Sequence, residues 1–200
     1  MKKIIFGLAI VAATLAACNN SSNKSDERQN AGNNTQAVSQ TDNKVLTTSS
    51  ASDAMNAFSI KEIVSQYLQI KDGLANDNGK DAASAGNVFV ESIGKMDITS
   101  LTAEKKKIWD NISDDAKEMA EHIGDNPDKL EHQREHFVML SKDMYDLVKT
   151  FGSEQVLYKV FDSMSNDGKG AFWLSETKEI KNPYMGKAML TSGSIQEEIK

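Results

Sequence analysis

The chain has 200 residues, of which 39% are hydrophobic and 26% charged, with a formal net charge of −6 and a single cysteine. The excess of acidic side chains argues against nucleic acid or anionic lipid as the main partner. One cysteine excludes an intramolecular disulfide framework, so a domain in this chain must be stabilised by its own hydrophobic core.

The N-terminal residues have the pattern of an export signal that ends at a cysteine. Lys2 and Lys3 precede a short apolar run, and "LAAC" closes that run with small residues before Cys18. This pattern predicts a signal peptide over residues 1–17. The cysteine resembles that of the bacterial lipoprotein lipobox, which implies that Cys18 carries a lipid anchor to a membrane. The alternative is an ordinary signal peptide with an incidental cysteine.

The segment after Cys18 is polar and lacks aromatic residues. Between positions 19 and 52, 21 of 34 residues are Asn, Ser, Thr or Gln. Such a segment cannot bury enough apolar surface to offset the loss of chain entropy on folding. We therefore expect residues 18–52 to form a lipidated, disordered tether and residues 53–200 to form a single domain. Removal of the leader with its two lysines gives this mature chain a formal charge of −8.

Four amphipathic patterns in the first two thirds of the domain predict helices. They cover approximately residues 59–74, 82–96, 102–123 and 127–151. Ser59 and Glu62 have the spacing of a capping box, and Asn126 followed by Pro127 is typical of a helix start. Because short connections imply antiparallel neighbours, we expect an all-α fold: an antiparallel up-and-down four-helix bundle.

The pattern changes after Gly152. "VLYKVF", residues 156–161, is compatible with a short strand, whereas the following residues are rich in Gly, Asn and aromatic side chains without a sustained period. We expect an irregular C-terminal tail packed against the bundle. Such segments on a rigid scaffold are where binding sites tend to be built.

Two histidines supply the main chemical signal. His132 and His136 are four residues apart on the fourth predicted helix, so both imidazoles project from one flank and can share a metal ion. Two ligands make a poor site, and we expect Met164 and Met189 of the tail to complete it. Imidazole and thioether together favour a soft or borderline ion such as copper. The alternative is a solvated helix flank, with the methionines filling gaps in the core.

No motif of a catalytic site occurs in the sequence. There is no nucleophile elbow, no phosphate-binding loop and no H-E-x-x-H pair. The segment that begins at Asp162 departs from a calcium loop, because Met164 and Asp167 occupy its third and sixth positions. We therefore expect a binding protein and not an enzyme.

The fourth helix and the tail contain "EHQREHFVMLSKDMYDLVKTFG", "LYKVFDSM" and "EIKNPYMGKAMLTSGS". Together these segments resemble a bacterial domain-of-unknown-function family common in Bacteroidetes, whose members are exported, often as lipoproteins. Some members are described as CusB-like copper or heavy-metal efflux proteins. In this family the segments aligned with "FDSM" and "LTSGS" read His-Cys-Pro-Met and Leu-Thr-Cys-Gly-Ser. Asp162 and Ser192 thus stand where the resemblance implies two cysteines.

Two functions remain open from the sequence. The first is a lipid-anchored envelope protein that serves as an accessory in copper or heavy-metal handling or efflux, with a metal ion or an efflux-system protein as its partner. We expect it at the periplasmic face of the outer membrane, with the cell surface as the alternative location. The second is a structural or protein-interaction module of the envelope that binds no metal.

Overall fold

Four helices are followed by three strands in the part of the chain that the structure describes. The computed structural model describes residues 58–200. Its elements are α1 (Lys61–Ala75), α2 (Gly79–Gly94), α3 (Ala103–Gly124), α4 (Leu130–Phe151), β1 (Leu157–Asp162), β2 (Ala171–Ser175), the 3-10 helix η1 (Gly186–Ala188) and β3 (Ser194–Ile199). The predicted signal peptide, the lipidation site Cys18 and the tether lie outside the described residues.

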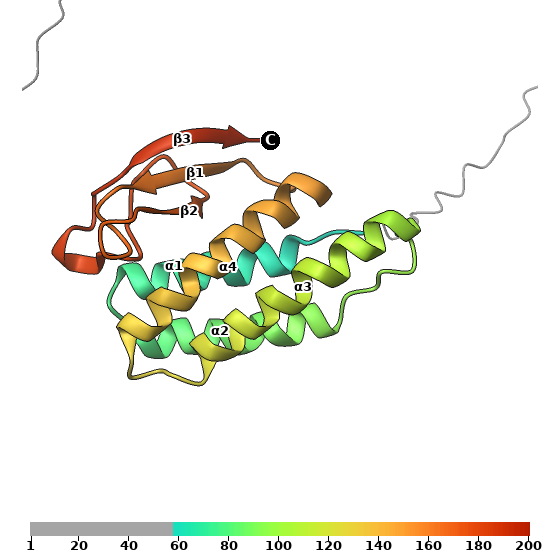
Figure 1. The fold of residues 1–200 in the computed structure, drawn as a ribbon, viewed down its shortest axis with the longest axis horizontal. Coiled ribbons are helices and arrows are strands. Elements are labelled where there is room, and N and C mark those ends of the chain that lie inside the picture. The colour runs from blue at the N-terminus through green and yellow to red at the C-terminus, as the bar shows by residue number, and fades with distance from the viewer. Residues whose placement is uncertain (1–57) are drawn as a thin grey trace, which may run out of the picture. The chain divides into compact units, whose positions relative to one another are not determined.

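The helices form because apolar side chains recur every three or four residues and must be removed from water. On α1, for example, Ile63, Tyr67, Ile70 and Leu74 are fully buried. α1 packs on α2, α2 on α3 and α3 on α4, and α4 also contacts α1 (Figure 1). The four predicted helices are therefore confirmed, and they pack on one another in chain order. None of the described helices is long and apolar enough to cross a bilayer.

The start of α1 differs from the prediction, because the expected capping box does not form. The N-cap residue is Ile60, without a side-chain bond. The Ser59 hydroxyl accepts a hydrogen bond from the Lys61 amide and donates one to Glu154. Glu62 accepts from Gln66 one turn later instead of reaching back to Ser59. Ser59 thus bonds to Glu154, which is far away in the chain, and the local spacing of residues does not reveal this partner.

The start of α4 also differs from the prediction. The helix begins at Leu130 and not at Pro127. The Asn126 side chain donates to the carbonyl oxygen of His122, so it satisfies the end of α3 and does not cap α4. A turn then leads into α4, closed by the amide of Lys129 donating to the carbonyl oxygen of Asn126.

The prediction of an all-α fold with an irregular tail is wrong. β1 lies where the short strand was expected, but it pairs with two further strands in an antiparallel sheet of order β2-β1-β3. Val160 of β1 pairs with Trp173 of β2 on one side and with Ile195 of β3 on the other. The fold is therefore mixed: four helices and a three-stranded sheet.

The two strands that the prediction missed have weak local signals. β2 is five residues long, and β3 is mostly exposed and carries neighbouring glutamates, so neither alternates cleanly between apolar and polar residues. Between β1 and β2 the residues Asn166, Asp167 and Gly168 all have positive φ, which Asn, Asp and Gly tolerate best. A turn of this composition between two apolar runs is a hairpin signal, and it was available in the sequence.

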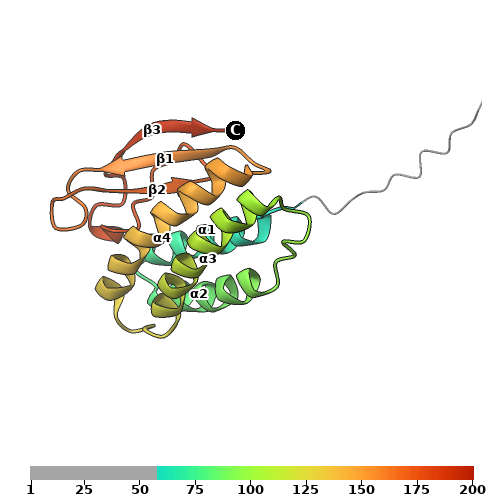
Figure 2. The same cartoon turned by 45° about the vertical axis from the view of Figure 1, so that its right-hand side comes forward.

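The sheet lies on one side of α1 and α4, and α2 and α3 lie on the other side (Figures 1 and 2). Buried hydroxyl groups join the sheet to the helices. The Tyr67 ring stacks on Phe137 at 5.1 Å, and its hydroxyl lies 2.9 Å from the Ser141 hydroxyl and accepts a hydrogen bond from the Leu174 amide of β2. The Tyr184 hydroxyl, from the segment after β2, also reaches Ser141. These bonds fix the C-terminal segment that follows α4 to α1 and α4.

Arg134 of α4 ties the segment after β2 to the connection between α1 and α2. Its guanidinium donates to the Pro183 carbonyl and to Asp77, and Asp77 also accepts from the Lys187 amide. Gly186 has φ +54°, and a Cβ there would overlap the Asp77 carboxylate and press against the guanidinium. No side chain fits at this position without opening the ion pair.

Gly186→Ala should therefore destabilise the protein by roughly 2–3 kcal/mol, because it combines left-handed backbone strain with a displaced ion pair. Urea denaturation followed by circular dichroism measures this. Gly94→Ala is the matched control, because a Cβ at Gly94 meets no atom within 4 Å. The control should be neutral or more stable by up to about 1 kcal/mol. Equal stability of the two variants would contradict this account of the tail.

Candidate metal centre

Three histidines meet where α3 ends and α4 begins. His122 lies in the last turn of α3, and His132 and His136 lie in the first two turns of α4. Each offers a ring nitrogen, and these donor atoms all lie within 4.8 Å of one another. The His136 ring stacks on His122 at 4.3 Å between centroids and meets His132 edge-on at 4.5 Å. The structure thus places the two predicted histidines together and adds a third, which sequence reasoning had missed.

A buried side-chain amide fixes the register of α3 along α4 near the histidines. Gln133 is fully buried, and its side-chain nitrogen donates to the carbonyl oxygens of Ile123 at 3.0 Å and Gly79 at 2.9 Å. His132 precedes Gln133 in the chain, and His122 precedes Ile123. The hydrogen bond between Gln133 and Ile123 therefore holds the end of α3 beside the start of α4. There His122 stacks on His136 and lies 6.1 Å from His132 between ring centroids.

A thioether lies beside the histidines. The sulfur of Met119, on α3 one turn before His122, lies 3.4 Å from Nδ1 of His136. Met119 is half-buried and packs against the hydrophobic core. The cluster therefore presents three imidazoles and one thioether from two helices. We refer to these four residues, Met119, His122, His132 and His136, as the histidine–methionine cluster.

Two carboxylates flank the imidazoles. Glu135 lies 3.6 Å from Nδ1 of His132, and Glu118 lies 3.9 Å from Nε2 of His122. In metal sites a carboxylate beside one ring nitrogen orients the imidazole and leaves the other nitrogen for the ion. At 3.6 and 3.9 Å neither carboxylate is hydrogen-bonded to its ring, so Glu135 and Glu118 must approach further to orient His132 and His122 in this way.

The environment of His136 favours the form that binds metal. Partial burial lowers the pKa of His136, and the neighbouring imidazoles of His122 and His132 lower it further. A metal-bound imidazole must be neutral, so a lowered pKa keeps this ligand available at neutral pH.

The spacing of the donors is close to that of a bound site. Two nitrogens on a tetrahedral ion lie roughly 3.3 Å apart, and a nitrogen and a sulfur roughly 3.5 Å apart. The Met119–His136 separation of 3.4 Å already meets this value. The imidazoles, within 4.8 Å, must approach further, and the stacked rings of His122 and His136 must turn so that both lone pairs point at one ion. His122 is exposed and the other two rings are half-buried, so none of the three rings is enclosed by the core.

The two tail methionines predicted as ligands lie in other surroundings. Met164, with 58% of its surface exposed, lines a depression of about 250 Å³ together with Glu131, Glu135 and Val138 of α4. These three residues lie on a face of α4 about one third of a turn from the two histidines. Met189 follows η1 and is 39% exposed. A ligand role for these methionines stays a prediction.

The two positions where the family resemblance implies cysteines lie together in the structure. Asp162 is buried and accepts hydrogen bonds from the Ser165 hydroxyl and the Asn182 amide, and the Ser192 side chain lies beside it. Burial raises the pKa of Asp162, but these hydrogen bonds and one from the Met164 amide hold it below its usual value. The carboxylate is therefore ionised and fully engaged, and it ties β1 to the segment that precedes β3.

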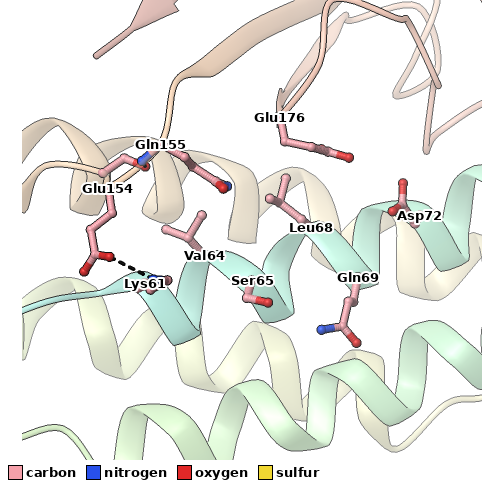
Figure 3. Close-up of a pocket in the computed structure, with 10 residues that line it drawn as sticks. Lys61, Val64, Ser65, Leu68, Gln69, Asp72, Glu154, Gln155 and Glu176 are labelled. Carbon is pink, nitrogen blue, oxygen red and sulfur yellow. Dashed lines mark hydrogen bonds and ion pairs between the residues drawn. The ribbon is translucent and has the colours of Figure 1, made fainter.

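A cleft of about 400 Å³ lies between α1 and the connection from α4 to β1 (Figure 3). Its lining residues are Lys61, Val64, Ser65, Leu68, Gln69, Asp72, Ser153, Glu154, Gln155 and Glu176. The carboxylates there are already paired: Glu154 with Lys61 at 3.1 Å, and Glu176 and Asp72 with buried Lys71 at 2.6 and 3.1 Å. The cleft is therefore a weaker candidate for a functional site than the histidine–methionine cluster.

Comparison with protein families gives one match. Residues 63–156 match the model of a family described as "Protein of unknown function (DUF3347)". The match runs from α1 to the residue before β1, which is just under half of the chain. It includes all four residues of the histidine–methionine cluster. The resemblance to a family of unknown function is confirmed to this extent. No curated protein and no solved structure matches the chain.

The crowding of the imidazoles leads to a prediction for the metal-free protein. His136 should titrate below its ordinary value of about 6.5, and His122→Asn should raise its pKa, because a neighbouring positive charge and part of the burial are removed. NMR titration of the imidazole ring protons measures both values. Lys107→Gln, which removes a charge at the other end of α3, should leave the pKa of His136 unchanged. An ordinary pKa in the parent protein would contradict this description of the cluster.

Residue-resolved titration is needed because another group titrates in the same range with the opposite effect. The lowered pKa of His136 adds stability that is complete above about 6.5 and is lost as the pH falls through its folded-state pKa. Burial and the charges of Asp115 and Asp146 raise the pKa of Asp143 to about 6. Asp143 therefore favours folding at low pH and loses that contribution as the pH rises through about 6.

Proposed function

We propose that the protein binds a transition-metal ion of the copper or zinc type at the histidine–methionine cluster and serves in metal handling at the cell envelope. The observation that carries this proposal is the convergence of three imidazole donors within 4.8 Å from two different helices. An isolated pair four residues apart on one helix is common on solvated helix flanks. A third histidine from the facing helix, together with the sulfur contact, distinguishes this cluster from such a flank.

The donor types favour certain ions. Calcium and magnesium require oxygen ligands, and the four side chains here supply nitrogen and sulfur. Imidazoles suit zinc and copper, and among divalent ions copper has the highest affinity for such donors. Glu118 and Glu135 would then orient two of the rings from outside the coordination sphere.

The position of the cluster supports handling of the ion in preference to a structural role. His122 is exposed, and His132 and His136 are half-buried. The hydrophobic core lies elsewhere, around residues such as Tyr67, Phe137 and Trp173, so folding does not depend on the ion. An ion at the surface of two rigid helices can be received from, and passed to, a partner protein.

The cellular setting of the proposal rests on the N-terminal sequence and on the family resemblance. Cleavage before Cys18 would leave a lipid-anchored protein on a polar tether, at the periplasmic face of the outer membrane or at the cell surface. The resemblance to copper and heavy-metal efflux proteins favours an accessory role in efflux, with an efflux-system protein as the partner.

Calorimetric titration with Cu(II) and with Zn(II) tests the proposal. The full chain carrying Cys18→Ala should be used, so that the thiol does not compete for the metal. We expect one ion per chain, with an affinity that decreases as the pH falls through about 6.5 because the imidazoles must be neutral. His132→Ala combined with His136→Ala should abolish binding and leave the helix content unchanged, and His122→Ala should weaken binding at least about tenfold.

One control variant and two variants of the tail methionines extend this experiment. Lys117→Ala combined with Glu121→Ala removes an exposed ion pair from the same stretch of α3 and should leave binding unchanged. Met164→Leu and Met189→Leu determine whether either tail methionine is a ligand. Binding by the double histidine variant equal to that of the parent protein would refute the site. If the parent chain binds neither ion, the alternative of a structural or interaction module without metal is the better account.

A further inference from the structure

We infer that Met119 gives the cluster its preference among ions, because its thioether enables the site to hold Cu(I) as well as Cu(II). Copper, in both oxidation states, is then the preferred cargo. This inference rests on the proposed function and names the ion that the same cluster takes.

The position of Met119 suits a ligand of the same ion as His136. The Met119 sulfur and Nδ1 of His136 lie 3.4 Å apart, close to the separation of roughly 3.5 Å that a nitrogen and a sulfur have on one tetrahedral ion. Met119 and His122 are three residues apart on α3 and therefore share the face that points at α4. Because Met119 packs against the core, its place beside His136 is set by the helices and does not depend on a mobile loop.

A thioether donor affects copper and zinc differently. Cu(I) is a soft ion that binds thioether sulfur well. Zinc prefers imidazole, carboxylate and thiolate, and it gains little from a neutral thioether. Three imidazoles alone would serve zinc and Cu(II) adequately. The added thioether therefore changes the affinity for Cu(I) most, and it distinguishes copper from zinc.

A competing explanation is that Met119 only fills the space between α3 and α4. Flexible methionines often do so, and sulfur packs well against aromatic rings. Met139 provides a matched comparison, since it lies three residues after His136 on α4 and is 41% exposed. It carries the same thioether near the cluster, whereas the sulfur in contact with His136 belongs to Met119.

The test compares Met119→Leu with Met139→Leu in the full chain carrying Cys18→Ala. Leucine nearly conserves the volume of methionine, so the core should tolerate the change. Cu(I) affinity is measured without oxygen, in excess ascorbate, by competition with a chromogenic Cu(I) chelator. Zn(II) and Cu(II) affinities are measured by calorimetry on the same samples. Met119→Leu should lower Cu(I) affinity by about tenfold or more and change Zn(II) affinity by less than about twofold. Met139→Leu should alter none of them.

The possible results separate this inference from the proposed function. Unchanged Cu(I) affinity in Met119→Leu overturns the inference and leaves the histidine site intact. Equal losses for Cu(I), Cu(II) and Zn(II) also overturn it, because they show that the methionine positions the helices and does not bind the ion. Failure of the parent chain to bind any of the three ions overturns both proposals.

Discussion

The hydrogen bonds of Gln133 are the constraint on which the candidate site depends. This fully buried amide reaches from α4 to the carbonyl oxygens at the end of α3 and the start of α2, so three helices meet at one side chain. The side-chain nitrogen of Gln133 is satisfied by these two carbonyl oxygens, whereas its Oε1 is buried with no hydrogen-bond partner among the described residues. Leaving the nitrogen unpaired as well would cost about 1–3 kcal/mol more. The register of the two helices is therefore fixed at Ile123 and Gln133, and His122 at the end of α3 is brought beside the histidines at the start of α4.

Different faces of α4 make different contacts. Phe137, Leu140 and Met144 are completely buried in the core. Ser141 bonds the tyrosines that hold the sheet, and Arg134 fixes the segment after β2. The flank with His132 and His136 makes none of these contacts and carries the candidate ligands. A rigid helix anchored on its remaining faces can hold two ligands at a constant spacing, which a surface loop could not do.

The sequence predicted the helical half of the domain well, because long amphipathic helices are determined largely by local periodicity. It failed for the sheet, because β3 pairs with β1 through backbone groups of residues far away in the chain, such as Ser194 with Phe161. The candidate site shows the same division. His132 and His136 were visible as a pair on one helix, whereas His122 and Met119 join them only through the packing of α3 on α4. The spacing of residues along a single helix does not contain that information.

The central claim is that one metal ion lies among three imidazoles and a thioether contributed by two helices. X-ray absorption at the copper edge tests it most directly, on the full Cys18→Ala chain loaded with one equivalent of Cu(I). The account predicts nitrogen scatterers at about 2.0 Å, with the multiple-scattering pattern of imidazole, and one sulfur at about 2.3 Å. A coordination shell of oxygen and nitrogen without imidazole scattering would contradict the account.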